Sequence, residues 1–160
     1  MLSFGTINAQ SVNKLKKQLL SSIEQKSDEL ITMSDNIWYA AEVAFREEKS
    51  AEYLMEYAKQ NGFDVDSDLA GMPTAFTATF GEGSPVIGII GEFDALPGLS
   101  QTTVPYKNEL TKGGAGHGCG HNLFGTASLG AAVAIKELIE KGSLKAVSYT
   151  HLRAHETFTD

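Results

Sequence analysis

The sequence has few of the features that mark secreted or membrane proteins. It contains a single cysteine, Cys119, so no disulfide can form within the chain, which is typical of a reducing compartment. It has no run of about 18 apolar residues, and its first residues show no basic segment followed by an apolar block. We therefore expect a soluble, cytoplasmic protein with no membrane partner.

Positive charge is also scarce. The chain has 13 Lys and Arg against 20 Asp and Glu, a net charge of -7. Nucleic-acid-binding proteins need a concentrated basic face, so we expect no nucleic-acid partner. The small cluster Lys14, Lys16 and Lys17 fits a solvated helix face. The glycines match neither the G-x-G-x-x-G nor the G-x-x-x-x-G-K-[ST] pattern, and no G-x-S-x-G nucleophile elbow is present.

A length of 160 residues suits one domain or part of a larger one. Apolar residues recur at steps of three and four over residues 12–43, which predicts one long amphipathic helix. Similar spacing predicts helices over 50–60 and over about 122–141. Small residues in the last of these indicate close packing against a sheet.

Two segments have the composition of strands. Residues 74–80 are rich in β-branched and aromatic residues, and the turn-like 81–85 leads into the apolar run 86–91. We predict two neighbouring strands. Because the second is apolar on both faces, we expect it to be a central strand covered by helices. The glycine-rich segment 94–120 follows as a long loop, where α/β enzymes commonly place their chemistry.

That loop carries two candidate metal ligands, Cys119 and His121, just before the last predicted helix. A thiolate and a neutral imidazole are good ligands for zinc-like ions, and the helix N-terminus adds favourable positive potential. His117 could be a third donor or only a neighbour. Two donors do not complete a structural zinc site, and Cys119 could instead be a buried small residue or a thiol nucleophile paired with a histidine.

Two carboxylates end the second predicted strand. The period of two places Glu92 and Asp94 on the same side, facing the loop. Such carboxylates can ligate a divalent ion or hold a ligating histidine in one tautomer, and they can equally be solvated acids at a strand end.

At these residues the chain resembles a known family. The segments GEFDALPGLSQ, residues 91–101, and GHGCGHNLFGTA, residues 116–127, are similar to the M20 family of metallopeptidases and amidohydrolases, within it the p-aminobenzoyl-glutamate hydrolase type. The resemblance extends from about Asp35 to about Leu144. It implies the N-terminal part of a zinc-peptidase-like α/β catalytic domain, truncated here, with a mixed central sheet flanked by helices.

The resemblance also implies a site. The complete protein would hold two bridged divalent metal ions, zinc or manganese, that activate a water for attack on an amide carbon. Cys119 and His121 match metal ligands of the family, and Asp94 stands where the family places a catalytic-site carboxylate behind the metals. Glu92 stands where many relatives have a ligating histidine.

The resemblance stops after Leu144. The family continues there into a strand and a pair of adjacent glutamates, whereas residues 145–160 read KAVSYTHLRAHETFTD. We therefore divide the chain into residues 1–144, the N-terminal part of the catalytic domain, and residues 145–160, a tail foreign to the family. The string formed by His151, His155 and Glu156 lacks H-E-x-x-H spacing and is not predicted to bind a metal.

These features give a functional hypothesis. The parent protein would cleave the amide bond between an acyl or aryl group and an amino acid, with p-aminobenzoyl-glutamate as the favoured substrate, and would form a homo- or hetero-oligomer. The chain itself would be inactive. The alternatives are a dipeptidase of the same family, acting on a dipeptide substrate, and a non-catalytic fragment with weak metal binding.

Overall fold

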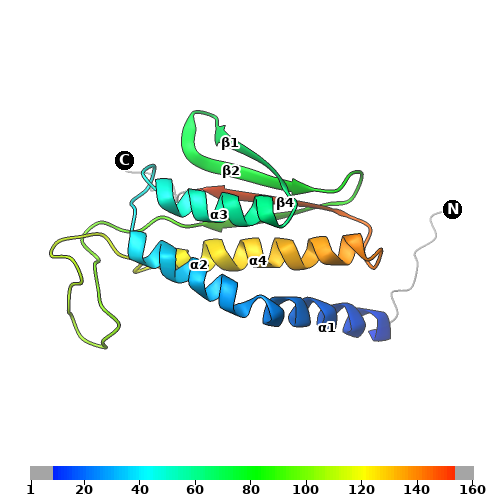
Figure 1. Ribbon diagram of the computed structural model, residues 1–160, viewed down its shortest axis with the longest axis horizontal. Coiled ribbons are helices and arrows are strands. Elements are labelled where there is room, and N and C mark those ends of the chain that lie inside the picture. The colour runs from blue at the N-terminus through cyan, green and yellow to red at the C-terminus, as the bar shows by residue number, and fades with distance from the viewer. Residues whose placement is uncertain (1–8, 154–160) are drawn as a thin grey trace.

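The computed structural model of the chain describes residues 9–153, and side chains from residue 12 onward. Helices and strands alternate irregularly along this part of the chain (Figure 1). The elements are α1 (Ala9–Gln25), α2 (Ser27–Ala40), α3 (Glu48–Gln60), β1 (Asp64–Leu69), β2 (Met72–Phe80), β3 (Val86–Glu92), α4 (His121–Glu140) and β4 (Val147–Arg153).

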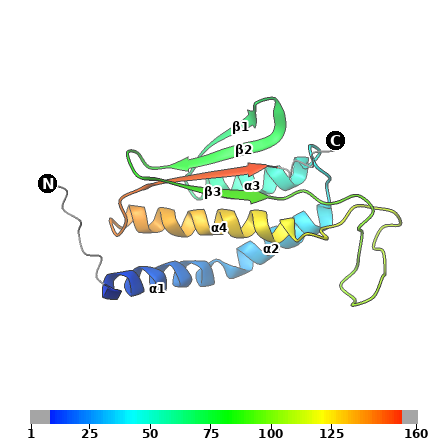
Figure 2. The same ribbon diagram turned by 180° about the vertical axis from the view of Figure 1, so that it is seen from behind.

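The four strands form one mixed sheet in the order β1-β2-β4-β3, in which β4 is antiparallel to β2 and parallel to β3. Figures 1 and 2 show the described helices on one face of this sheet. Helices α3 and α4 lie against the strands, and α1 and α2 form a further layer beneath them. The α/β fold class with a mixed sheet is therefore as predicted.

The predicted position of the apolar strand 86–91 was wrong. It forms β3, which lies at one edge of the described sheet and not at its centre. Its neighbour is β4, so the two predicted strands are not adjacent. Helix α4 covers one face of β3, while Val86 and Ile90 on the other face are 60% and 61% exposed. Apolar composition alone cannot reveal that a strand from later in the chain takes the central position.

The single long helix predicted over 12–43 is two helices that meet at Lys26. This residue has φ -107° and ψ 6°, outside the helical region, and Asp28 and Glu29 in the first turn of α2 favour a new helix N-terminus. The Lys26 ammonium forms an ion pair with Glu137 of α4. The break allows both α1 and α2 to pack against α4. The apolar residues keep their spacing across the break, so the spacing does not predict it.

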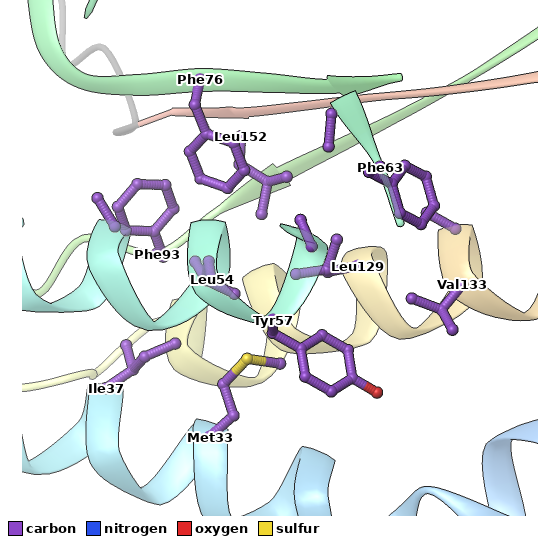
Figure 3. Close-up of a cluster of buried hydrophobic side chains, with 14 residues drawn as sticks. Met33, Ile37, Leu54, Tyr57, Phe63, Phe76, Phe93, Leu129, Val133 and Leu152 are labelled. Carbon is purple, nitrogen blue, oxygen red and sulfur yellow. The ribbon is translucent and has the colours of Figure 1, made fainter. Parts of the chain in front are cut away.

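The core lies between the sheet and the layer of α3 and α4 (Figure 3). Phe76 and Leu152 point down from the sheet, Phe93 follows the end of β3, and Leu54 and Leu129 meet them from the helices. All five side chains are 0% exposed. Burial of this cluster fixes the end of β3 against the start of α4, where the predicted site residues lie. Within residues 9–153, no helix combines the length and apolar character of a membrane span.

The described part of the predicted tail, up to Arg153, forms β4 between β2 and β3. His155 and Glu156 lie outside the described residues. The side chains of β4 fit this position unevenly, because Ser148 and Thr150 are 0% exposed and neither hydroxyl has a hydrogen-bond partner among residues 9–153. A buried hydroxyl without a partner costs about 1–3 kcal/mol. Apolar side chains would suit these two positions better.

This mismatch predicts that Thr150→Val stabilises the protein. Valine keeps the shape of threonine and removes the unpaired hydroxyl, so the free energy of unfolding should rise by about 1 kcal/mol. Urea denaturation followed by circular dichroism measures the change. The matched control is Thr103→Val at an exposed position, with an expected effect within about 0.5 kcal/mol. Destabilisation by Thr150→Val beyond that of the control would show that the hydroxyl has a partner.

Candidate functional site

The predicted carboxylates and one predicted metal ligand meet where β3 ends and α4 begins. Nδ1 of His121 lies 2.8 Å from Oδ1 of Asp94, and Nε2 of His121 lies 3.3 Å from Oε2 of Glu92. The His121 side chain is 13% exposed, Asp94 3% and Glu92 16%. Both nitrogens of a largely buried imidazole therefore face carboxylate oxygens.

The local sequence explains this arrangement. Glu92 is the last residue of β3, Phe93 points into the core, and Asp94 returns to the side of Glu92, as the period of two predicts. His121 is the first residue of α4 and follows Gly120, whose φ of 74° places it in the left-handed region that glycine adopts readily. The glycine turns the chain into the helix and brings the imidazole onto the two carboxylates.

The long loop between β3 and α4 is held by backbone hydrogen bonds. The amide of Ala95 donates to the carbonyl of Glu42 at 2.7 Å. Leu96 and Gly116 exchange hydrogen bonds in both directions, at 2.9 and 3.0 Å. At Gly116 a Cβ atom would lie 2.2 Å from the carbonyl oxygen of Leu99, so only glycine fits there. This close approach closes the loop just before the segment that carries Cys119.

Cys119 does not join the cluster around His121. Its thiol is free and the residue is exposed. Among residues 9–153, no group of three or more His, Cys, Asp and Glu side chains is arranged to hold a metal ion. The structure therefore brings Asp94 and His121 together, adds Glu92 to them, and leaves Cys119 at the surface two residues away in sequence.

His117 anchors the loop to α2. Its Nε2 lies 3.0 Å from the carbonyl oxygen of Ile37, an acceptor, so Nε2 carries the hydrogen. Burial lowers the pKa of His117 and so favours the neutral ring. The hydrogen bond to Ile37 partly offsets this lowering. Nδ1 is then an acceptor, and it is buried without a hydrogen-bond partner in the described part of the chain.

Two acidic residues beside the site were missed by the sequence reasoning. The Glu42 carboxylate accepts hydrogen bonds from the backbone amides of Lys49 and Ser50 and from the Ser50 hydroxyl, and so caps the start of α3. Glu47 is 0% exposed and accepts a hydrogen bond from the Thr74 hydroxyl at 2.7 Å. Its sequence neighbour Glu48 is exposed, so only the tertiary structure distinguishes the two glutamates.

The contacts of His121 suit a divalent cation in their chemistry. The Asp94 carboxylate accepts the hydrogen of Nδ1, and Nε2 of the same ring faces the Glu92 oxygen. Imidazole nitrogen, carboxylate oxygen and the thiolate of Cys119 are all zinc ligands, although together they are fewer than a complete two-metal site needs.

Comparison with known sequences finds several similar curated proteins. The chain is 43% identical over 121 residues to one subunit of the p-aminobenzoyl-glutamate hydrolase of Escherichia coli K12, a match that covers 75% of this chain and 25% of that protein. No family model matches the chain. The chain spans about a quarter to a third of the length of the curated relatives it matches.

Comparison with solved structures gives the same fold. A structure described as an aminohydrolase, from methicillin-resistant Staphylococcus aureus, aligns with a TM-score of 0.71 at 24% identity, covering 88% of this chain and 35% of that one. A dinuclear metal-binding peptidase of the M20 family, from Bacillus subtilis, aligns with a TM-score of 0.69 at 23% identity, covering 83% and 36%. At these identities the likeness establishes the fold, and the chain spans only part of each of those structures.

Proposed function

Because this chain belongs to the M20 family of metallopeptidases and amidohydrolases, we propose that the protein it forms part of is a metal-dependent amidohydrolase. The favoured substrate is p-aminobenzoyl-glutamate, named in the E. coli relative that is 43% identical to this chain. The observation that carries the proposal is the contact of His121 with Asp94 and Glu92, at the position where the family resemblance puts a metal ligand and the carboxylate behind it.

The cofactor in this proposal is a pair of divalent ions, zinc or manganese. The solved structure from B. subtilis is described as a dinuclear metal-binding protein, which supports the pair of metals. From this chain, Cys119 and His121 would be ligands. When bound, the metals supply Lewis-acid polarisation of an amide carbonyl and a nucleophile at neutral pH.

The chain's own residues would prepare the site. Asp94 accepts the Nδ1 hydrogen of His121 and fixes the ring, so that Nε2 is directed toward Glu92. Burial of Asp94 keeps water from competing for that hydrogen bond. In the family, one of two adjacent glutamates moves the proton. The sequence after Leu144 contains only Glu156, so we propose that the chain by itself does not turn over substrate.

The proposed domain division remains at residue 144. Residues 1–144 belong to the catalytic domain, and residues 145–160 are foreign to the family. The unpaired buried hydroxyls of Ser148 and Thr150 support this division, because they are a poor match to the centre of a sheet. The E. coli relative is one of the subunits of its hydrolase. This supports the proposal that the complete protein forms an oligomer with a second kind of polypeptide.

A chimaera tests the proposed function. Residues 1–144 of this chain would replace the matched segment of the E. coli relative, which would supply the rest of the protein. We expect hydrolysis of p-aminobenzoyl-glutamate, measured as release of p-aminobenzoate, and loss of that hydrolysis on Cys119→Ser. The control is the chimaera with Ser100→Ala in the same loop, because Ser100 is not a proposed metal donor. The 160-residue chain alone should release no product above a metal-buffer blank.

The outcomes separate the alternatives. A folded, metal-loaded chimaera that cleaves dipeptides but not p-aminobenzoyl-glutamate would favour a dipeptidase, which the M20 peptidase among the similar structures makes the second candidate. A folded chimaera that binds metal and cleaves neither would reject the assignment of residues 1–144 to a catalytic domain.

A further inference from the structure

Phe124 is a large apolar side chain that stands exposed beside the predicted metal ligand His121. It lies in the first turn of α4 and is 43% exposed. Residues 121 and 124 are three positions apart on the helix, so their side chains share one face. The centroids of the His121 and Phe124 rings lie 6.4 Å apart, with the ring planes at 56°. The phenyl ring therefore flanks the imidazole that would bind a metal ion.

Phe124 takes no part in the core of the described chain. It is neither in the buried cluster between the sheet and the helices nor among the partly buried side chains packed against that cluster. Other residues of the same stretch do pack inward, since Asn122, Gly125 and Thr126 are buried. Single exposed apolar side chains are common on protein surfaces, so exposure alone assigns no role to Phe124. Its contact with His121 is what connects it with the site.

The loop that carries Cys119 also presents an apolar side chain close to a predicted ligand. Leu99 is 46% exposed, and its Cδ1 would lie 2.6 Å from a Cβ added at Gly118. The Leu99 side chain therefore packs over Gly118, the residue before Cys119. Exposed apolar side chains thus lie at both predicted ligands, Phe124 against His121 and Leu99 over the neighbour of Cys119. Binding sites for small molecules combine apolar walls with a few polar or metal-binding groups, and this region has that character.

The chemistry of the proposed substrate brings an aryl group to the same region. In p-aminobenzoyl-glutamate the ring is bonded directly to the carbonyl carbon at which the amide is cleaved. A carbonyl held for attack beside His121 would therefore bring its ring close to Phe124. Two aromatic rings attract each other in offset-stacked or edge-to-face arrangements, with centroids about 4.5–7 Å apart. A saturated ring of the same size lacks this attraction.

We propose that Phe124 is a specificity-determining residue whose ring receives the aryl group of the substrate and so favours aryl amides over alkyl amides. The inference rests on the proposed function and deepens it, because it names a residue that recognises the acyl side of the amide. The preference that Phe124 supplies does not depend on which amino acid is released, since its ring contacts the group on the other side of the cleaved bond.

The test uses the chimaera that carries residues 1–144 of this chain, with two amides of glutamate as substrates. One has the p-aminobenzoyl group and the other a cyclohexanecarbonyl group, a saturated ring of the same size. Phe124→Leu removes the aromatic ring and keeps an apolar side chain, whereas Phe124→Tyr keeps the ring. The matched control is Tyr53→Leu, which removes an aromatic side chain that is 38% exposed on α3, outside the site.

Phe124→Leu should lower kcat/KM for p-aminobenzoyl-glutamate roughly 3- to 10-fold, the range expected for loss of one aromatic pair. It should leave kcat/KM for the cyclohexanecarbonyl amide within about two-fold. Phe124→Tyr and Tyr53→Leu should leave both values within about two-fold. A side chain that only supports the fold would affect both amides alike, so equal losses for the two amides in Phe124→Leu, or no loss for either, would overturn the proposal.

A second readout covers the case in which the chimaera cleaves neither amide, so that the proposed function fails. The metal-free 160-residue chain is titrated with p-aminobenzamide, a neutral probe that has the aryl group and no glutamate. The ring ¹H and ¹³C NMR signals of Phe124 should move progressively with added probe, while the ring signals of Tyr53 should stay in place. Phe124 signals that do not move, or that move no more than those of Tyr53, would overturn the proposal independently of any activity.

Discussion

Replacing His121 with alanine is expected to weaken zinc binding by the chain at least about 100-fold. Substitution of residues that only orient a metal ligand typically costs 10- to 100-fold in affinity, and loss of a direct donor should cost no less than the upper end of that range. His121 is the residue on which both carboxylates converge, Asp94 at 2.8 Å and Glu92 at 3.3 Å. Isothermal titration calorimetry with zinc measures the affinity.

The control for this prediction is His151→Ala. His151 lies on β4, and its Nε2 is buried without a hydrogen-bond partner in the described residues, so its removal changes the histidine content without touching the site. Zinc affinity should be unchanged. Equal affinity of the His121→Ala and unmodified chains would place the zinc elsewhere in the protein.

The second large effect is on stability. Gly116→Ala should lower the free energy of unfolding by about 3 kcal/mol, the upper end of the range for overpacked substitutions. The added Cβ would lie 2.2 Å from the carbonyl oxygen of Leu99 and 2.7 Å from its carbonyl carbon, and backbone cannot yield as a flexible side chain can. The substitution should also break the paired hydrogen bonds between Gly116 and Leu96 that close the loop before Cys119.

Gly88→Ala is the matched control for Gly116→Ala. Gly88 lies in β3, and a Cβ there would meet no atom within 4 Å. Urea denaturation should show a change within about 0.5 kcal/mol for Gly88→Ala. Similar stabilities of the two variants would mean that the loop moves away from Leu99 at little cost.

Local patterns predicted the elements around the site well. The helices expected over 50–60 and 122–141 are α3 and α4, and the strands expected over 74–80 and 86–91 are β2 and β3. These segments have strong periodicity and clear turn residues at their ends. The same alternation of side chains correctly placed Glu92 and Asp94 on one side of the strand end, because the period of two is a property of the backbone itself.

The features that were missed depend on partners distant in sequence. The edge position of β3 follows from β4, which enters the sheet more than fifty residues later. The break at Lys26 follows from packing on α4, and the burial of Glu47 follows from its meeting with Thr74. Hydrophobic periodicity carries no information about any of these contacts. Cys119 is exposed in the structure, and its role as a metal ligand beside His121 stays a prediction.

The central claim is that this chain carries Cys119 and His121 as donors of an M20-type metal site. Titration with cobalt(II), a spectroscopic substitute for zinc, tests it most directly, because a thiolate ligand produces a charge-transfer absorption band in the near ultraviolet. We predict a saturable band in the unmodified chain that is absent in Cys119→Ser and in His121→Ala. Saturable cobalt binding without that band, or a band that persists in Cys119→Ser, would contradict the claim.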